Sequence, residues 1–266
     1  IILHDRCNGV NTVLMNAQYK ERDFREYPLV VGTRGSPLAI AQAEETCQKL
    51  MKFHTMPKQC FDIRVIKTTG DLVQNRPLSE IGGKGLFTKE IEEQLLGGHI
   101  DIAVHSMKDM PTVLPSDLSI STVLAREDVR DSFVSVKYNS IDDLPIGATV
   151  GTSSLRRKAQ LLAQRDDLNV IEFRGNVQTR LKKLELGVAD ATFHACAGLS
   201  RLGMKELINP ISIESMLPAV AQGAIGIEQR TDNELISDLL KPINDQNTET
   251  QLAVERSFLK VLDGSC

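Results

Sequence analysis

The first part of the fold is decided by the stretch Leu29-Val30-Val31-Gly32-Thr33-Arg34-Gly35-Ser36-Pro37. Its β-branched run predicts a strand that ends at Gly32-Thr33. Ser36 is a good helix N-cap, and Pro37 suits the first helical position because its missing N–H would be unpaired there anyway. Apolar side chains then recur on one helical face, at Ile40, Ala43, Cys47 and Leu50. Residues 29–53 are therefore predicted to form a strand, a tight turn and a helix.

The same design recurs in Thr149-Val150-Gly151-Thr152-Ser153-Ser154-Leu155, which again predicts a strand, a Gly-Thr turn and a Ser-capped helix. Further strands are predicted at 61–65, 100–104, 170–173 and 191–193, and another within 217–227. Further helices are predicted at 87–95, 177–184, 232–241 and 248–262. Strands that alternate with helices imply a mostly parallel sheet, and the repeat suggests two domains of similar build. Chance similarity of two short segments is the alternative.

Composition narrows the function classes. The 266 residues fit about two domains, and no run of 18 apolar residues predicts a membrane span. A net charge of −4 and 4% aromatic residues weigh against nucleic-acid binding, for which Arg156, Arg157 and Lys158 would be the only candidate cluster. The five cysteines are odd in number and form no C-x-x-C pair, so we expect a reducing compartment, no disulfide framework and no metal site.

Cations gather where predicted strands meet helices. They are Arg34, Lys84, Lys108, Arg156, Arg157, Arg174 and Arg180. Open α/β sheets bind ligands at the carboxyl ends of their strands, where helix N-termini add free N–H donors. The planar guanidinium suits carboxylates. The pattern predicts a cleft for a ligand with several carboxylates, and the alternative for each cation is a solvated surface charge.

Two other side chains carry possible chemistry. Asp109 follows an apolar strand and precedes Pro111, so it can exchange protons and stabilise a cation, or can merely cap the turn. Cys266 follows the small residues Gly264 and Ser265, so it is an accessible nucleophile or a spectator thiol. His105 and His194 are interpreted as structural histidines with satisfied hydrogen bonds.

At these residues the chain resembles the porphobilinogen deaminase family, from about residue 29 to its end. The motifs that carry the resemblance are Gly32 to Ala39, Gly82 to Phe87, His105 to Pro111, Gly151 to Arg157, Arg174 to Asn176, Leu217 to Gly226 and Leu262 to Cys266. The resemblance implies a transferase of haem and chlorophyll biosynthesis. Such an enzyme deaminates four porphobilinogen molecules and joins them head to tail into the linear tetrapyrrole hydroxymethylbilane.

The resemblance also implies residue roles. Cys266 would carry the dipyrromethane cofactor, a primer of two linked substrate units, through a thioether, and Asp109 would be the catalytic residue. The other implied cofactor contacts are Lys84, Ser106, Lys108, Asp109, Thr152, Ser153, Ser154, Arg156, Arg157, Arg174 and Gly175. The implied substrate contacts are Arg34, Ser36, Phe87, Arg174, Arg180, Arg201 and Gln222.

The fold that the resemblance implies is α/β, with two similar periplasmic-binding-protein-like domains around a cleft and a small α+β third domain. Residues 1–28 would be an N-terminal extension, 29–125 with 201–229 domain 1, and 126–200 domain 2. Residues 230–266 would be the start of domain 3, which carries the cofactor cysteine. Because the sequence stops at Cys266, we expect this third domain to lack most of its sheet and the activity of this form to be in doubt.

The final motif, Asp263-Gly264-Ser265-Cys266, departs from the Gly-Gly-Cys form of many family members and resembles the plant and plastid branch. We therefore expect a plastid location, with the cytoplasm as the alternative, and a monomer. Porphobilinogen is the expected partner, and neither nucleic acid nor membrane is expected to bind. The alternative function is that of a non-enzymatic two-domain binding protein for a small polycarboxylate anion.

Overall fold

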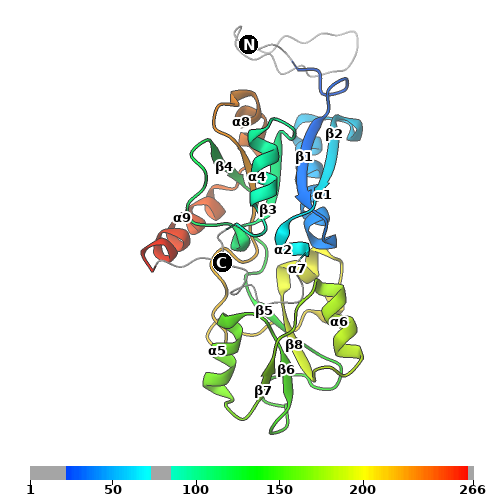
Figure 1. Cartoon of the computed structure of the whole chain (residues 1–266), viewed down its shortest axis with the longest axis vertical. Coiled ribbons are helices and arrows are strands. Elements are labelled where there is room, and N and C mark those ends of the chain that lie inside the picture. Colours follow the sequence, from blue (N-terminus) through cyan, green and yellow to red (C-terminus); the bar gives the residue numbers. More distant parts are fainter. Residues whose placement is uncertain (1–21, 73–84, 263–266) are drawn as a thin grey trace.

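The computed structural model describes residues 22–72 and 85–262. Two lobes lie one beyond the other along the longest axis of the molecule, each built on its own sheet (Figure 1). The first sheet has the strand order β2-β1-β3-β9-β4, and the second has the order β5-β8-β6-β7. The expected α/β architecture of two domains that each contain a sheet is confirmed.

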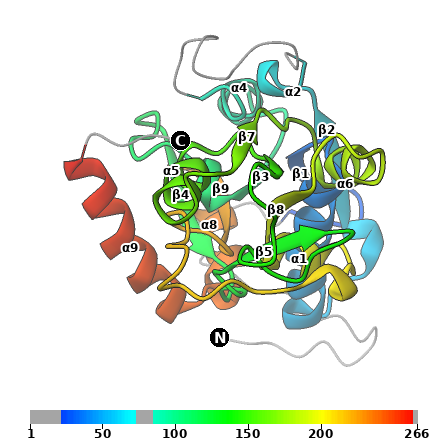
Figure 2. The ribbon, with the colours of Figure 1, turned by 90° about the horizontal axis from the view of Figure 1, so that it is seen from below.

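The first sheet contains β1 (Leu29–Arg34), β2 (Phe61–Ile66), β3 (Ile102–Ser106), β4 (Leu118–Val123) and β9 (Ile225–Arg230). Its helices are α1 (Pro37–His54), α2 (Thr69–Leu72), α4 (Lys89–Leu96), α8 (Glu234–Leu240) and α9 (Gln246–Val261). Single 3₁₀ turns lie at Lys58–Cys60, Met107–Asp109 and Lys241–Ile243. Figure 2 shows α9 beside β4, at the edge away from β2.

The second sheet contains β5 (Asp131–Ser135), β6 (Thr149–Gly151), β7 (Asn169–Ile171) and β8 (Ala191–Ala195). Its helices are α5 (Leu155–Gln164), α6 (Val177–Glu185) and α7 (Cys196–Arg201), followed by a 3₁₀ turn at Lys205–Leu207. Its core includes Phe133, Val150, Leu161 and Phe193, all at most 3% exposed.

The predicted strand–turn–helix repeat is confirmed in both lobes. Ser36 accepts a hydrogen bond from the N–H of Ala39 at the start of α1, and Ser154 accepts one from the N–H of Arg157 at the start of α5. Four of the seven strand pairings among the described residues are parallel, in line with the expectation of mostly parallel sheets, whereas β3–β9, β4–β9 and β5–β8 are antiparallel. These antiparallel pairs involve the strands next to the two connections between lobes, where the chain direction reverses.

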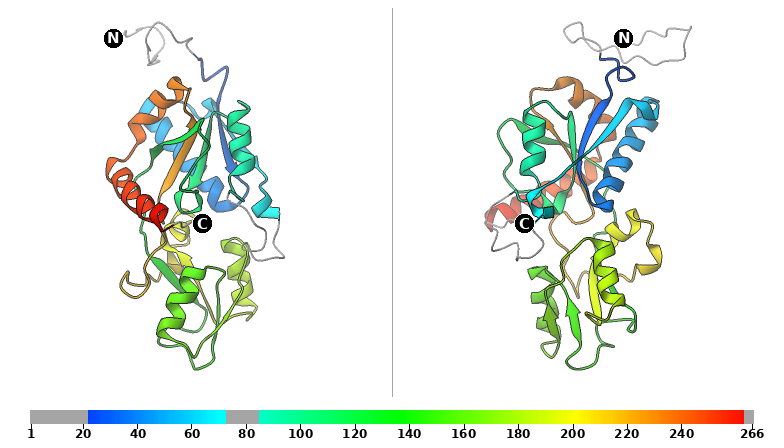
Figure 3. Two further views of the ribbon diagram at one scale, coloured as in Figure 1. Left: turned by 60° about the vertical axis from the view of Figure 1, so that its left-hand side comes forward. Right: turned by 45° about the vertical axis from the view of Figure 1, so that its right-hand side comes forward.

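The chain crosses between the lobes twice (Figure 3). The outgoing connection, residues 124–130, links β4 to β5, and the return connection, residues 208–224, leads to β9 in the middle of the first sheet. The first lobe is therefore assembled from both ends of the described chain. Ile236 and Leu240 of α8 belong to the same hydrophobic cluster as Leu29 and Ile102. The expected domain boundaries, including a third domain that begins at residue 230, stay predictions.

Arg126 of the outgoing connection joins three parts of the molecule. Its Nε donates to the carbonyl of Gln222 at 2.9 Å, and its two Nη atoms lie 2.5 and 3.0 Å from the carboxylate of Glu255 in α9. Glu255 also accepts from the N–H of Ala221 at 2.7 Å. Burial raises the pKa of Glu255, but the hydrogen bonds from Arg126 and Ala221 outweigh it and lower this pKa below its ordinary value. Both connections are thus held against α9.

We expect Arg126→Met to lower the free energy of unfolding by about 2 kcal/mol, because a hydrogen-bonded charge is worth about 1.5–3 kcal/mol and Glu255 would lose its partner. Chemical denaturation measures the loss. Arg130→Met is the matched control, because Arg130 pairs with Asp128 at a more exposed site and its loss should leave the free energy of unfolding nearly unchanged. Equal losses in the two variants would contradict the assigned role of Arg126.

Candidate functional site

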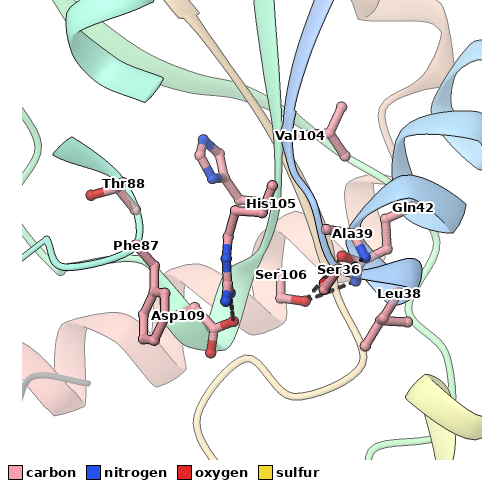
Figure 4. Close-up of a pocket in the computed structure, with 11 residues that line it drawn as sticks. Ser36, Leu38, Ala39, Gln42, Phe87, Thr88, Val104, His105, Ser106 and Asp109 are labelled. Atoms are coloured by element: carbon pink, nitrogen blue, oxygen red, sulfur yellow. Dashed lines mark hydrogen bonds and ion pairs between the residues drawn. The ribbon is translucent and has the colours of Figure 1, made fainter. Parts of the chain in front are cut away.

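A pocket opens at the carboxyl ends of β1 and β3 in the first lobe. Figure 4 shows Phe87 and Asp109 on one of its sides and Ser36, Ser106 and Gln42 on the other. The pocket is also lined by Arg34, Leu38, Ala39, Thr88, Val104 and His105. Three predicted substrate contacts and the predicted catalytic residue are therefore brought together. The position agrees with the general rule for ligand sites of open α/β sheets.

Arg34 is the cation of this pocket. Its fork pairs with Asp71 through two nitrogen atoms, and its guanidinium carbon lies 4.1 Å from the centre of the Phe87 ring. Although burial raises the pKa of Asp71, the hydrogen bond and charge of Arg34 outweigh it and keep this pKa below its usual range. Asp71 therefore stays ionised at neutral pH and fixes the orientation of Arg34.

Asp109 ends the 3₁₀ turn after β3, and its side chain is 37% exposed. Its Oδ2 atom lies 3.8 Å from Nη1 of Arg34, which is an ion pair beyond ordinary hydrogen-bonding distance. Within the described residues, its carboxylate makes no hydrogen bond to the backbone of its own turn. The carboxylate is thus held near a cation and stays accessible from the pocket.

Lys108 connects the pocket to the second lobe electrostatically. Burial lowers the pKa of Lys108, and the charge of Asp109 opposes this effect. The positive charges of Arg157 and Arg180, which belong to the second lobe, lower this pKa further. The cations predicted from both halves of the sequence therefore lie near enough to interact.

Ser36 and Ser106, the two predicted hydroxyl contacts in the first lobe, already have partners in the structure. Ser36 caps α1, and Ser106 lies 2.8 Å from Nε2 and 3.2 Å from Oε1 of Gln42. His105 lies 2.9 Å from Glu228, and both side chains are buried, which confirms a satisfied structural histidine.

The loops after β6 and β7 supply the polar residues of the second lobe. Thr152 accepts from the N–H of Ser154, and Ser153 accepts from the N–H of Phe173 at 3.0 Å. Gly175 has φ of +121°, and a Cβ atom there would lie 2.7 Å from Thr179, so only glycine fits. These contacts explain the local shape of both loops.

Arg156 and Arg157 share one acidic partner, Asp131 of β5, which is fully buried. Nη2 of Arg156 lies 2.6 Å from Oδ2, and Nη2 of Arg157 lies 2.7 Å from Oδ1. Nε2 of Gln222 donates to the same Oδ1 at 3.0 Å and to the carbonyl of Val129 at 2.7 Å. Burial raises the pKa of Asp131, but the arginine charges outweigh it and lower this pKa.

Arg180 and His194 lie beside these arginines. Burial and the charge of Arg157 lower the pKa of Arg180 to about 10. His194 is only 2% exposed, and its Nε2 has no hydrogen-bond partner among the described residues, nor has Nε of Arg180. The expectation of a satisfied His194 is therefore wrong. The imidazole is buried, yet its ring nitrogen is left unsatisfied beneath a cluster of cations.

Other predicted contacts lie elsewhere or cannot be placed. Nε of Arg201 in α7 pairs with Glu45 of α1 at 2.9 Å, which connects the two lobes, but neither residue lines the pocket. Arg174 is half-buried, and its carbonyl accepts from Lys183. Lys84 and Cys266 lie outside the described residues.

Comparison with known proteins identifies the family. A family model described as "Porphobilinogen deaminase, dipyromethane cofactor binding domain" matches residues 29–238. The chain belongs to the porphobilinogen deaminase family. The porphobilinogen deaminase of Paracoccus denitrificans is 59% identical over 240 residues, which cover 90% of this chain and 77% of that protein. The chloroplastic porphobilinogen deaminase of Pisum sativum is 54% identical over 89% of this chain and 65% of that protein.

The fold of this porphobilinogen deaminase family member resembles solute-binding proteins. A solved methionine-binding protein, MetQ, has a TM-score of 0.52 at 12% identity, covering 88% of this chain and 96% of that one. This likeness concerns the fold alone and confirms the expected periplasmic-binding-protein-like architecture. In residues 22–72 and 85–262 no helix is both long enough and apolar enough to span a bilayer.

The described cysteines of this family member are poor nucleophiles. Burial raises the pKa of Cys47 to about 12 and that of Cys196 to about 11, and it also raises the pKa of Cys60. A thiol with a raised pKa is rarely a thiolate at neutral pH, so these three side chains are unsuited to covalent attachment.

The sequence analysis missed Asp131, Asp71 and Gln42, which fix the orientation of predicted ligand contacts. One signal for Asp131 was present, because this charged residue stands just before the apolar pair Phe133-Val134, which suits a buried strand. A buried charge requires a partner, and the nearby sequence offered several arginines. Asp71 and Gln42 carried no comparable signal.

The state of His194 makes the stability of the protein depend on pH. Burial lowers the pKa of His194 to about 2, and the charges of Arg180, Arg157 and Lys108 add to this effect. The unfolded chain binds a proton near pH 6.5 that the folded chain does not bind, so the free energy of unfolding falls as the pH drops below 6.5.

We expect this contribution of His194 to be about 1.5 kcal/mol between pH 6.5 and pH 5. Denaturation at both pH values should therefore show a weaker pH dependence in His194→Leu than in the unchanged protein. His99→Leu is the control, because His99 is exposed and should leave the dependence unaltered. The same pH dependence in all three proteins would refute a neutral buried His194.

Proposed function

We propose that the cleft between the lobes converts porphobilinogen into hydroxymethylbilane, with the residues described above in distinct roles. The observation that carries the proposal is that Arg157 and Arg180, which share the carbonyl of Phe193 in the second lobe, lie within electrostatic range of Lys108, the neighbour of Asp109 in the first lobe. A growing chain of pyrroles bears several carboxylates, and such a ligand requires several cations held close together. Membership of the porphobilinogen deaminase family supports the same activity.

The cations also fit the dipyrromethane cofactor of the family. The buried, unpartnered Nε of Arg180 lies among other cations and suits a carboxylate that enters the cleft. We propose that the group is held by Lys84, Ser106, Lys108, Thr152, Ser153, Ser154, Arg156, Arg157, Arg174 and Gly175. Cys266 would carry it through a thioether. When bound, the cofactor supplies a tethered pyrrole to which substrate units are added.

The first-lobe pocket is the proposed substrate site. Arg34 faces it with its fork fixed by Asp71, so it can bind a substrate carboxylate without first being ordered. The Phe87 ring covers the guanidinium and offers a flat surface to a pyrrole. Ser36, Arg174, Arg180, Arg201 and Gln222 complete the proposed substrate contacts. Of these, Arg201 and Gln222 each have a protein partner, but Nη2 of Arg201 and Oε1 of Gln222 have no hydrogen-bond partner among the described residues.

Asp109 is the proposed catalytic residue. It would give a proton to the departing amine of the substrate and then offset the positive charge left on the pyrrole. Its 3.8 Å separation from Arg34 suits this task. A carboxylate in close contact with a guanidinium would have its negative charge largely neutralised and would stabilise a developing cation less well.

We expect Asp109→Asn to fold and to lose about 10²–10⁴ of kcat, because asparagine keeps the shape but neither the charge nor the transferable proton. Steady-state assay of porphobilinogen consumption measures the loss. Asp117→Asn is the control, since Asp117 is exposed and distant in the fold from the pocket residues. Turnover near the normal rate in a folded Asp109→Asn protein would show that Asp109 has only a structural role in its turn.

A second prediction concerns the covalent bond. Since the three described cysteines have raised pKa values, we expect intact-mass measurement to show a two-pyrrole adduct and peptide mapping to place it on Cys266. Cys266→Ser should abolish the adduct, and Cys60→Ser should leave it in place. An adduct on another cysteine, or one that persists in Cys266→Ser, would overturn the assignment. A wholly bare protein would instead favour the non-enzymatic polycarboxylate-binding alternative.

The compartment and assembly state are also proposals. The Asp-Gly-Ser-Cys motif and the relative from Pisum sativum support a plastid location, whereas the bacterial relative at 59% identity is compatible with the cytoplasm. Cell fractionation distinguishes the two. We propose a monomer, as the family resemblance implies, and sedimentation in solution tests this.

A further inference from the structure

One buried carboxylate holds the two arginines at the start of α5. Asp131 is 0% exposed, and its two oxygens bind different arginines, Oδ2 to Arg156 and Oδ1 to Arg157. Nε of Arg157 lies 3.2 Å from the same Oδ1. No contact from a second acidic side chain to either arginine occurs in the described part of the chain. Both forks therefore depend on Asp131 for their orientation.

The arginines need this partner because their position is electrostatically unfavourable. They lie in the first turn of α5, which contains no acidic residue, and the N-terminus of a helix carries a partial positive charge. They also repel one another, and burial together with Arg157 lowers the pKa of Arg156 against the opposing effect of Asp131. Without an anion nearby, the two side chains would turn toward solvent.

The remaining hydrogen bonds limit the forks further. Nη1 of Arg157 donates to the carbonyl of Phe193 at 3.0 Å, and Nη1 of Arg156 donates to the carbonyl of Leu217 at 2.5 Å. The side chain of Arg156 remains 23% exposed, so part of its fork can still meet a ligand. Arg157 is 7% exposed and its Nε, Nη1 and Nη2 all have partners, so Arg156 carries the accessible part of the pair.

We infer that Asp131 is a positioning residue, which fixes Arg156 and Arg157 so that they bind the carboxylates of the pyrrole chain. The inference rests on the proposed function for the identity of the ligand. A buried carboxylate could instead act by charge alone. The two roles predict opposite changes in anion affinity when the carboxylate is removed. Removal of a negative charge would tighten anion binding if charge alone mattered, whereas loss of orientation would weaken it.

The test uses Asp131→Asn in the full chain, with Asp128→Asn as the matched control. Asp128 lies three residues away and pairs with Arg130 at a more exposed site, so both variants change the net charge equally. Binding is measured by calorimetric titration with butane-1,2,3,4-tetracarboxylate, which has as many carboxylates as two linked substrate units. A Cys266→Ser background keeps the site free of any adduct. Adduct content by mass and the separate values of KM and kcat are measured without that background.

We expect Asp131→Asn to weaken tetracarboxylate binding by about ten-fold or more, as the loss of one charged hydrogen bond predicts. Adduct content should fall and KM should rise more than kcat falls, whereas Asp128→Asn should behave like the unchanged protein. Tighter or unaltered binding in Asp131→Asn overturns the inference. So does a loss of stability alone with normal affinity in the folded fraction.

Asp131→Glu serves where Asp131→Asn does not fold. It keeps the charge and moves the carboxylate by one methylene, so weaker binding supports positioning and unaltered binding refutes it. The two proposals fail separately. An unchanged protein that binds the tetracarboxylate but carries no adduct and consumes no porphobilinogen contradicts the proposed function, while the comparison of affinities still decides the role of Asp131.

Discussion

Mutual repulsion among the cleft cations is the constraint on which the rest of the structure depends. Lys108, Arg157 and Arg180 come from different elements, and the charges of Arg157 and Arg180 lower the pKa of Lys108, while that of Arg157 also lowers the pKa of Arg180. The fold holds them together with few opposite charges. The carbonyl of Phe193, in the middle of β8, accepts from both Arg157 and Arg180, and the buried carboxylate of Asp131 accepts from Arg157. Neutral acceptors orient a cation without cancelling the charge that an anionic ligand needs.

In the first lobe, Arg34 interacts unequally with two nearby carboxylates. Arg34 is close to two carboxylates, Asp71 and Asp109. Within the described residues its hydrogen bonds go to Asp71, and Asp109 stays at 3.8 Å. The carboxylate of Asp71 therefore fixes the orientation of the guanidinium, and the carboxylate of Asp109 stays available to interact with the ligand. Two acidic residues near one arginine thus have different tasks, which are set by distance and not by residue type.

Local sequence patterns predicted the elements that depend on local chemistry. The caps at Ser36 and Ser154 and the helices behind them follow from residue types alone. Strands β4 and β5 and helix α7 were not predicted, because their formation depends on pairing with distant segments such as β9 and β8. The same limit applies to the site, where cations at strand ends were predictable and their partners were not. Asp131 meets Arg157 only because β5 lies beside β8 in the second sheet.

The partners missed by sequence reasoning also connect the site to the crossings between lobes. Asp131 is the first residue after the outgoing connection, and Gln222 of the return connection donates a hydrogen bond to it. A shift of either connection would therefore displace the carboxylate that orients Arg156 and Arg157. Arg126 and Glu255 hold both connections against α9, some distance along the chain from any cation of the cleft. The geometry of the anion site thus depends on the Arg126–Glu255 ion pair, which lies outside it. This pair holds the two connections in place, and the connections in turn fix the position of Asp131, the partner of Arg156 and Arg157.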